Sequence, residues 1–212
     1  MTLMDHIVVV VDDDYRIREA LLELLTAAGL NVVTFGSAAE YLRFAKPDLP
    51  ACLILDVELP DINGLELQRQ IAADQHPHIV FLTGHGDVPS SVRALKAGAV
   101  DFLTKPFREQ DLLAAIQAAL AQDHESRRKR AELAGLQQRL AALTPREREV
   151  LPLVVSGLLN KQAAAELGIS EVTLQIHRGR IMHKMQAESL AELVRMAGTL
   201  GIPASRSRRA RA

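Results

Sequence analysis

Three consecutive aspartates, Asp12, Asp13 and Asp14, directly follow a run of four valines at residues 8–11. An apolar run of this kind is typical of a buried strand, so the acids are expected at a strand end. Neighbouring carboxylates repel one another unless they share a proton or bind a cation. Because no histidine or cysteine stands beside them, the expected partner is an oxygen-binding cation such as Mg²⁺.

Further polar residues stand at the ends of three other predicted strands. Asp56 and Thr83 follow directly on apolar runs, and Lys105 follows the predicted strand VDFLT. Ligands of open parallel sheets bind beyond the carboxyl ends of the strands, and we expect these side chains to meet there. A carboxylate nucleophile, a cation-binding pair of acids, an ammonium and a hydroxyl together suit the handling of a phosphoryl group.

The elements that must position these residues are short apolar strands alternating with longer segments of helical period. Strands of nearly continuous apolar character joined through helices predict an α/β domain, with a five-stranded parallel sheet covered by helices on both faces. The predicted strands are 6–11, 31–35, 51–55, 78–82 and 100–104, and the predicted helices are 15–29, 37–45, 64–74, 89–98 and 109–122.

Length and charge are consistent with two domains. Of the 212 residues 48% are apolar, which is enough for two cores. Residues 1–121 contain 17 acidic and 9 basic residues, whereas residues 122–212 contain 9 acidic and 16 basic ones. This division is expected if the acidic half binds cations or proteins and the basic half binds nucleic acid. Ordinary solvated surface charge explains it as well. Residues 201–212 are predicted to be a basic disordered tail.

The only cysteine, Cys52, stands within an apolar run and is interpreted as a buried small hydrophobe. No apolar run approaches the roughly 18 residues of a membrane span, and the first residues lack the basic flank and apolar core of a signal peptide. We therefore expect a cytoplasmic protein without a membrane partner.

Residues 122–142 are predicted to form a helical linker. Leu133, Leu136 and Leu140 in its second half, and Leu143 just beyond it, recur at helical spacing. This apolar seam suits an extension of the preceding helix, or a short interdomain helix that pairs with a partner. A solvated helix that packs lightly on its own domain explains the same spacing.

Residues 143–200 are predicted to form a small all-α domain of four helices. Thr144, Pro145 and Glu147 have the types and spacing of a capping box with proline at the first helical position. The second and third helices, joined through Gly168, have the arrangement of a helix-turn-helix. The four helical segments are 143–157, 160–168, 169–185 and 189–201.

The third of these helices is expected to enter the major groove of double-stranded DNA. At about 100° per residue, Leu174, Ile181 and Met185 share an inward side. The residues predicted to face the bases are Val172, Gln175, Ile176, Gly179 and His183. Phosphate contacts are expected from Thr173, His177, Arg180 and Lys184, and by position from Lys161 and Arg178. Gln175 suits adenine N6 and N7, whereas Val172 or Ile176 suits a thymine methyl group.

Residues 5–121 resemble the receiver domain of two-component response regulators. The resemblance is carried by the segments VVVDDD, LILDVELPDINGLEL and FLTGHGDVPSSVRALKAGAVDFLTKPF. It implies a flavodoxin-like strand order of 2-1-3-4-5, Mg²⁺ as the cofactor, and a sensor histidine kinase as the phosphate donor. Apart from catalysing its own phosphorylation and dephosphorylation, such a protein is not an enzyme.

The same resemblance implies a role for each residue at the strand ends. Asp56 accepts the phosphoryl group, Lys105 pairs with one of its oxygens, and Thr83 moves to hydrogen-bond another. The implied metal ligands are Asp13, Asp56, the backbone carbonyl of Glu58, and Asp12 through a water molecule. Phe102 is the aromatic switch that turns inward when Thr83 moves, and the Lys105–Pro106 peptide bond is cis.

Glu58 and His85 are expected to tune the lifetime of the phosphoryl group. Glu58 stands two residues after Asp56, and His85 stands two residues after Thr83, where the hydrolytic water approaches. Our hypothesis is that Glu58 changes Mg²⁺ affinity and dephosphorylation by adding a negative charge beside the phosphoryl group.

Residues 143–198 resemble the LuxR-type DNA-binding domain through the segments LTPREREVL, NKQAAAELGIS and SLAELVRM. The whole chain thus resembles a FixJ/NarL-type response regulator, and most closely the FixJ branch. This implies a phosphorylation-dependent transcription regulator that binds promoter DNA and contacts RNA polymerase. Phosphorylation is expected either to favour a homodimer or to release the DNA-binding domain. Gln175 and Gly179 depart from the charged residues often found there, so the family's base preferences do not transfer.

Two other functions fit parts of the sequence. A phosphorylation-independent DNA-binding regulator would use its receiver only for protein contacts, but the complete set of five strand-end residues argues against it. An Mg²⁺-dependent phosphatase with an aspartyl-phosphate intermediate would carry a DxD pattern after the first strand and a substrate cap. Here the acids are adjacent and no cap segment is present.

Overall fold

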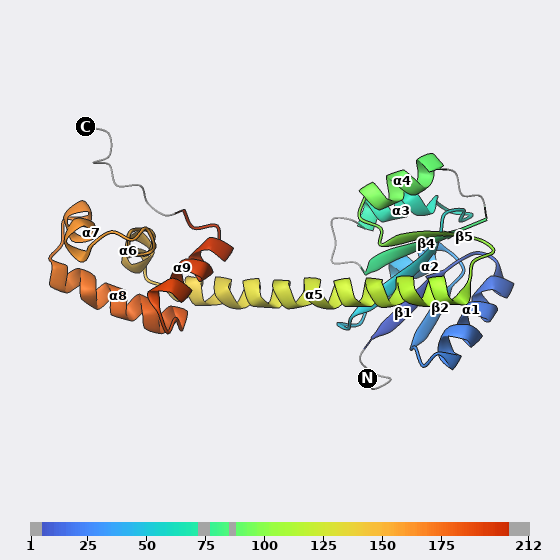
Figure 1. The fold of residues 1–212 in the computed structure, drawn as a ribbon, viewed down its shortest axis with the longest axis horizontal. Helices are drawn as coiled ribbons and strands as arrows, with labels where there is room; N and C mark the ends of the chain where they lie inside the picture. The colour runs from blue at the N-terminus through green and yellow to red at the C-terminus, as the bar shows by residue number, and fades with distance from the viewer. Residues whose placement is uncertain (1–5, 72–76, 85–87, 204–212) are drawn as a thin grey trace. The chain divides into compact units, whose positions relative to one another are not determined.

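The computed structural model describes residues 6–71, 77–84 and 88–203. Contacts between residues divide the chain into two compact units, Met1–Arg127 and Arg128–Ala212 (Figure 1). Each unit is built around a hydrophobic core of its own. Across the described ranges, no helix has both the length and the apolar composition needed to cross a membrane.

The first unit contains a five-stranded parallel sheet of order β2-β1-β3-β4-β5, which confirms the predicted order. Every residue of β1 and β3 is buried, as expected for central strands of nearly continuous apolar sequence with helices on both faces. The strands are β1 Ile7–Val11, β2 Val32–Phe35, β3 Ala51–Asp56, β4 His78–Thr83 and β5 Asp101–Thr104.

Two helical layers cover the sheet, and alternation along each strand divides its side chains between them. Val9 and Leu53 lie in the core shared with α2, α3 and α4, whereas Val8 and Cys52 lie in the core shared with α1 and α5 (Figure 1). The burial of Cys52 agrees with its interpretation as a small hydrophobe. The helices of this unit are α1 Tyr15–Ala27, α2 Ala38–Arg43, α3 Gly64–Ile71, α4 Val88–Lys96 and, as far as Arg127, α5 Glu109–Ala141.

Helix α5 has 33 residues and runs through nearly all of the predicted linker. Among the alternatives predicted for that segment, the structure therefore shows an extension of the preceding helix. Asp123, within this extension, is buried and accepts hydrogen bonds from the backbone N–H of Ala51 at 3.0 Å and from Arg127 Nε at 2.6 Å. The first unit therefore continues past residue 121.

The second unit contains four further helices with the predicted local start and stop signals. Thr144 and Glu147 form the predicted capping box at the start of α6, with Pro145 in the first turn. Gly168 ends α7 with a φ of 65°, a left-handed conformation that glycine adopts without strain. The helices are α6 Pro145–Val155, α7 Asn160–Leu167, α8 Glu171–Met185 and α9 Leu190–Thr199. The predicted disordered tail falls outside the described residues from 204 onward.

Candidate metal centre and nucleic-acid interface

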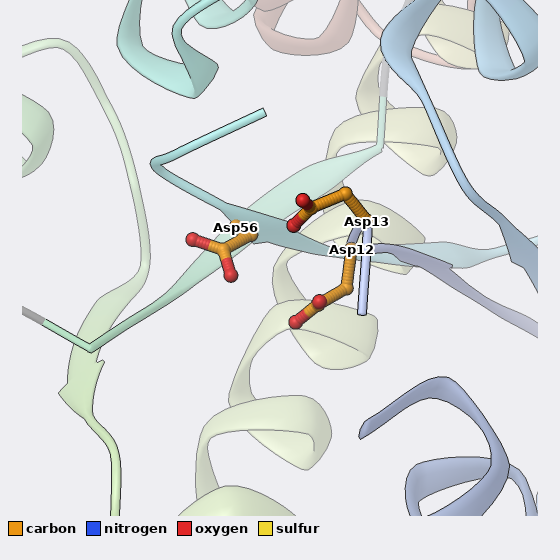
Figure 2. Close-up of side chains that lie close together, drawn as sticks. All are labelled: Asp12, Asp13 and Asp56. Atoms are coloured by element: carbon orange, nitrogen blue, oxygen red, sulfur yellow. The ribbon is translucent and has the colours of Figure 1, made fainter. Parts of the chain in front are cut away.

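Three acids meet at the carboxyl edge of the sheet. Asp12 and Asp13 follow β1, Asp56 ends β3, and carboxylate oxygens of all three lie within 4.8 Å of one another (Figure 2). Asp12 and Asp56 are buried, whereas Asp13 is exposed. Their proximity follows from the pairing of β1 with β3, which brings the ends of the two strands together.

The Lys105 ammonium joins two of these acids. Its Nζ lies 2.6 Å from Asp12 Oδ2 and 2.5 Å from Asp56 Oδ2. The backbone N–H of Lys105 donates to the carbonyl of Thr83 at 2.7 Å, so the residue is tied to the end of β4 as well. Lys105–Pro106 is a cis peptide bond, as predicted.

Burial and charge act against each other in this cluster. Burial raises the pKa of Asp12 above its ordinary value; hydrogen bonding to Lys105 offsets this in part, and the charge of Asp56 adds to it. Burial alone would lower the pKa of Lys105, but its hydrogen bonds to the carboxylates of Asp12 and Asp56 outweigh burial and raise it. The ammonium therefore stays charged and neutralises part of the acidic cluster.

The donor set of this site fits a hard divalent cation. It consists of carboxylate oxygens, with no histidine or cysteine in the group found among the described residues. Three carboxylates against one ammonium leave a net negative charge at the open edge of the sheet, which attracts a cation. Oxygen ligands are those that Mg²⁺ and Ca²⁺ prefer.

The loop between β3 and α3 is held against the same edge. The backbone N–H of Glu58 donates to Asp56 Oδ1 at 2.9 Å, and the exposed Glu58 side chain lines the pocket that the acids share with Lys105 and Gly84. Glu58 thus lies where the sequence predicts it, beside the acids. The other residue expected to tune this site, His85, lies outside the described residues.

Sequence reasoning missed two residues that fix this loop. The Asp61 carboxylate accepts backbone N–H groups of Ala38 and Ala39 at 3.3 and 2.8 Å, which ties the loop to the first turn of α2. At Gly64, a Cβ atom would lie 2.2 Å from the backbone oxygen of Asp56, so only glycine fits. A glycine opening a predicted helix, where it is a poor helix former, is the signal from which this close approach could have been predicted.

Thr83 and Phe102 lie on the neighbouring strands β4 and β5. Thr83 ends β4 and is fully buried. Phe102 is half-buried, pairs in register with Phe81, and has its ring centroid 6.0 Å from that of Phe81. The structure thus brings both residues to the side of the sheet where α4 packs, and their switch roles stay predictions.

The outer face of α8 presents the predicted base-reading residues to solvent. Val172 and Ile176 are 69% and 50% exposed, unusually high fractions for large apolar side chains. The inward residues Leu174, Ile181 and Met185 are fully buried, as the helical period predicts. The other exposed members of the predicted DNA surface are Lys161, Gln175, Gly179, Arg180 and His183.

Four residues predicted to contact phosphate are partly buried: Thr173, His177, Arg178 and Lys184. Three of them have side-chain partners within the unit, and the hydroxyl of Thr173 lies 2.8 Å from that of Ser170. Arg178 donates to the side chain of Asn160 at 3.2 Å, and the Lys184 ammonium lies 2.7 Å from the Glu147 carboxylate. Burial alone would raise the pKa of Glu147, but hydrogen bonds from Lys184 and from the backbone of Thr144 outweigh burial and lower it.

Comparisons with known proteins cover both units. Residues 8–117 match the family described as the response regulator receiver domain, and residues 141–197 match the luxR family of bacterial regulatory proteins. Nodulation protein W of Bradyrhizobium diazoefficiens is 51% identical over 200 residues, which cover 94% of this chain and 88% of that protein.

Two further relatives are similar over their whole length. The transcriptional regulatory protein FixJ of Bradyrhizobium diazoefficiens is 43% identical over 204 residues, which cover 95% of this chain and 98% of that protein. The solved structure of the response regulator StyR aligns with a TM-score of 0.80 at 48% identity, covering 92% of this chain and 98% of that one.

Proposed function

The chain belongs to the response regulators, as a receiver domain followed by a LuxR-type DNA-binding domain, and we propose that Asp56 is the phosphoacceptor through which phosphorylation controls its binding to DNA. The observation that carries this proposal is the cluster of Asp12, Asp13 and Asp56 within 4.8 Å, with the Lys105 ammonium between two of them.

The proposed transfer starts from a phosphohistidine on a sensor histidine kinase. A carboxylate oxygen of Asp56 attacks the phosphorus, the phosphorus–nitrogen bond breaks, and its electron pair leaves with the imidazole. Lys105 pairs with one phosphoryl oxygen and the Thr83 hydroxyl donates to another. The receiver thereby catalyses its own phosphorylation and, with water as the attacking group, its own dephosphorylation, whose rate Glu58 tunes.

The acids would hold Mg²⁺ through the carboxylates of Asp13 and Asp56, the backbone carbonyl of Glu58, and Asp12 through water. When bound, this cation neutralises charge on the phosphoryl oxygens as the new bond forms. The Lys105 ammonium offsets part of the charge of the acids, and its two ion pairs hold Asp12 and Asp56 together.

Phosphorylation is proposed to shift an equilibrium between two existing states of the receiver. The Thr83 hydroxyl moves toward the phosphoryl group and Phe102 turns inward, which changes the face formed by α4, β5 and α5. That face then forms a homodimer, and the paired DNA-binding domains engage double-stranded promoter DNA and contact RNA polymerase in the cytoplasm.

The DNA contacts are proposed to come from the exposed face of α8. Val172, Gln175 and Ile176 read base edges, while the exposed cations Lys161 and Arg180 contact phosphates. The residues proposed in addition, from their positions on α8, are Thr173, His177, Arg178, Gly179 and His183. Lys184 is not among them, because its ammonium is paired with the Glu147 carboxylate within the unit.

Intact-mass spectrometry after incubation with acetyl phosphate and Mg²⁺ tests the phosphoacceptor assignment. We expect the parent protein to gain one phosphoryl group, and we expect Asp56→Asn and the parent without Mg²⁺ to gain none. Asp101→Asn, which changes a partly buried acid on β5 outside the cluster, is the matched control and should be phosphorylated like the parent. Phosphorylation of Asp56→Asn to the parent level would contradict the proposal.

A further inference from the structure

Arg18, in the first turns of α1, binds the backbone of two of the three clustered acids. Its Nη1 donates to the carbonyl oxygen of Asp12 at 2.7 Å and to that of Asp13 at 2.9 Å. Both hydrogens of one guanidinium nitrogen are thus used on the turn between β1 and α1. Within this turn, Asp12 Oδ1 also accepts the backbone N–H of Asp14, which in turn caps α1.

The loop after β2 lies against the guanidinium of Arg18 on another side. A Cβ atom added at Gly36 would lie 3.4 Å from Arg18 Nη1 and 3.6 Å from its Cζ, which are ordinary contact distances. Gly36 is itself fixed, because its N–H donates to the carboxylate of Glu40 at 2.8 Å. The guanidinium therefore lies between the turn after β1 and the loop after β2.

From this geometry we infer that Arg18 is a positioning residue for the metal centre. This inference rests on the function proposed above. Asp13 is exposed, so side-chain packing does little to direct its carboxylate toward Asp56. The conformation of its backbone decides that direction, and Arg18 holds this backbone at two successive carbonyls. Residues that orient metal ligands in this way change metal affinity by about 10- to 100-fold when they are lost.

The charge of Arg18, taken alone, predicts the opposite effect of its removal on metal affinity. A measurement of that affinity can therefore decide between the two roles. A guanidinium beside a cation site repels the cation, so its removal without any change in backbone geometry should tighten metal binding. If positioning dominates, removal should weaken binding. The sign of the change in affinity separates the two roles.

The test measures binding of Mn²⁺ to the full chain, with free Mn²⁺ determined by electron paramagnetic resonance and Mg²⁺ as the competitor. It is carried out at a temperature where circular dichroism shows each variant to be folded. Arg18→Gln is expected to bind Mn²⁺ about 10-fold more weakly than the parent. Arg16→Gln is the matched control, because Arg16 is exposed on the same helix and its side chain bonds to Tyr15. Its affinity should stay within about twofold of the parent.

A second variant keeps the test decisive if Arg18→Gln folds poorly. Arg18→Lys keeps the charge and one donor group, and should recover only part of the lost affinity. Mn²⁺ binding as tight as in the parent, or tighter, in either folded variant overturns the inference. If Asp13→Asn binds Mn²⁺ like the parent, the metal centre itself, and with it the proposed function, is contradicted.

Discussion

The ammonium of Lys184 on α8 lies 2.7 Å from the carboxylate of Glu147 on α6. The side chain of Glu147 is only 1% exposed. The same carboxylate accepts the backbone N–H of Thr144 at 2.8 Å and so completes the capping box of α6. One buried acid therefore joins the start of α6 to the last turn of the proposed DNA-reading helix. Lys184 is held within the unit by this pair.

Replacing Lys184 with methionine should destabilise the second unit by about 1–3 kcal/mol, because the buried Glu147 carboxylate loses its ammonium partner and keeps the N–H of Thr144. The salt dependence of DNA binding should change little, since the ammonium is already paired within the protein. Chemical denaturation measures the first quantity, and DNA affinity measured over a range of salt concentrations gives the second.

Arg180→Gln is the matched comparison for Lys184, because Arg180 is exposed on the same helix. Loss of a phosphate contact should lower the slope of log affinity against log salt by about 0.9, with little change in stability. If Lys184→Met lowered the slope as much and left stability unchanged, its ammonium would be a phosphate contact after all.

Acid should weaken the contribution of Glu147 to stability. The pKa of Glu147 in the folded protein lies below its ordinary value near 4.5, so the stabilisation is fully present above that pH. It is lost as the pH falls through the lower pKa of the folded state. The difference in unfolding free energy between the parent and Glu147→Gln should thus shrink over the range below about pH 4.5. A difference that stays constant across this range would be inconsistent with the ion pair.

Gly64→Ala should damage the receiver through backbone contact. Its new Cβ would lie 2.2 Å from the backbone oxygen of Asp56, so the loop after β3 must shift. Overpacking of this kind costs about 1–3 kcal/mol. We expect a lower melting temperature and slower phosphorylation by acetyl phosphate. Gly84→Ala, at a glycine with open space around it, is the control and should change the melting temperature little.

The exposed Val172 and Ile176 side chains predict recognition of thymine methyl groups. A DNA duplex selected from a random library by the phosphorylated protein serves as the probe, with each thymine replaced in turn by deoxyuridine. Loss of one contacted methyl should weaken binding about fourfold, the value of roughly 0.8 kcal/mol for a buried methyl-sized group. Val172→Ala or Ile176→Ala should remove that preference at its own position. Equal affinity for all deoxyuridine duplexes would exclude this mode of reading.

The strand-end site is predictable from the sequence because its causes are local and regular. Apolar runs locate the strands, and the rule for parallel sheets then places Asp12, Asp56 and Lys105 at one edge. The capping box at Thr144 and Glu147 is likewise predictable, since it depends on residues only three apart.

Contacts that depend on the packing of distant elements are not accessible in this way. A helical wheel places Lys184 on the flank of α8, but it carries no information on Glu147, which lies on a different helix. In the sequence, Arg18 is one of several charged residues on a predicted amphipathic helix. Only the three-dimensional turn after β1 shows that it binds the carbonyls of Asp12 and Asp13.

Control of DNA binding by phosphorylation of Asp56 is tested most directly by the affinity of the full chain for a selected DNA duplex. Fluorescence anisotropy measures this affinity with and without acetyl phosphate and Mg²⁺. The parent should bind about 10-fold more tightly with the phosphodonor, within the usual range of coupling between two sites. Asp56→Asn should bind with the weaker affinity under both conditions. An equal gain in affinity for Asp56→Asn, or no gain for the parent, would contradict the account.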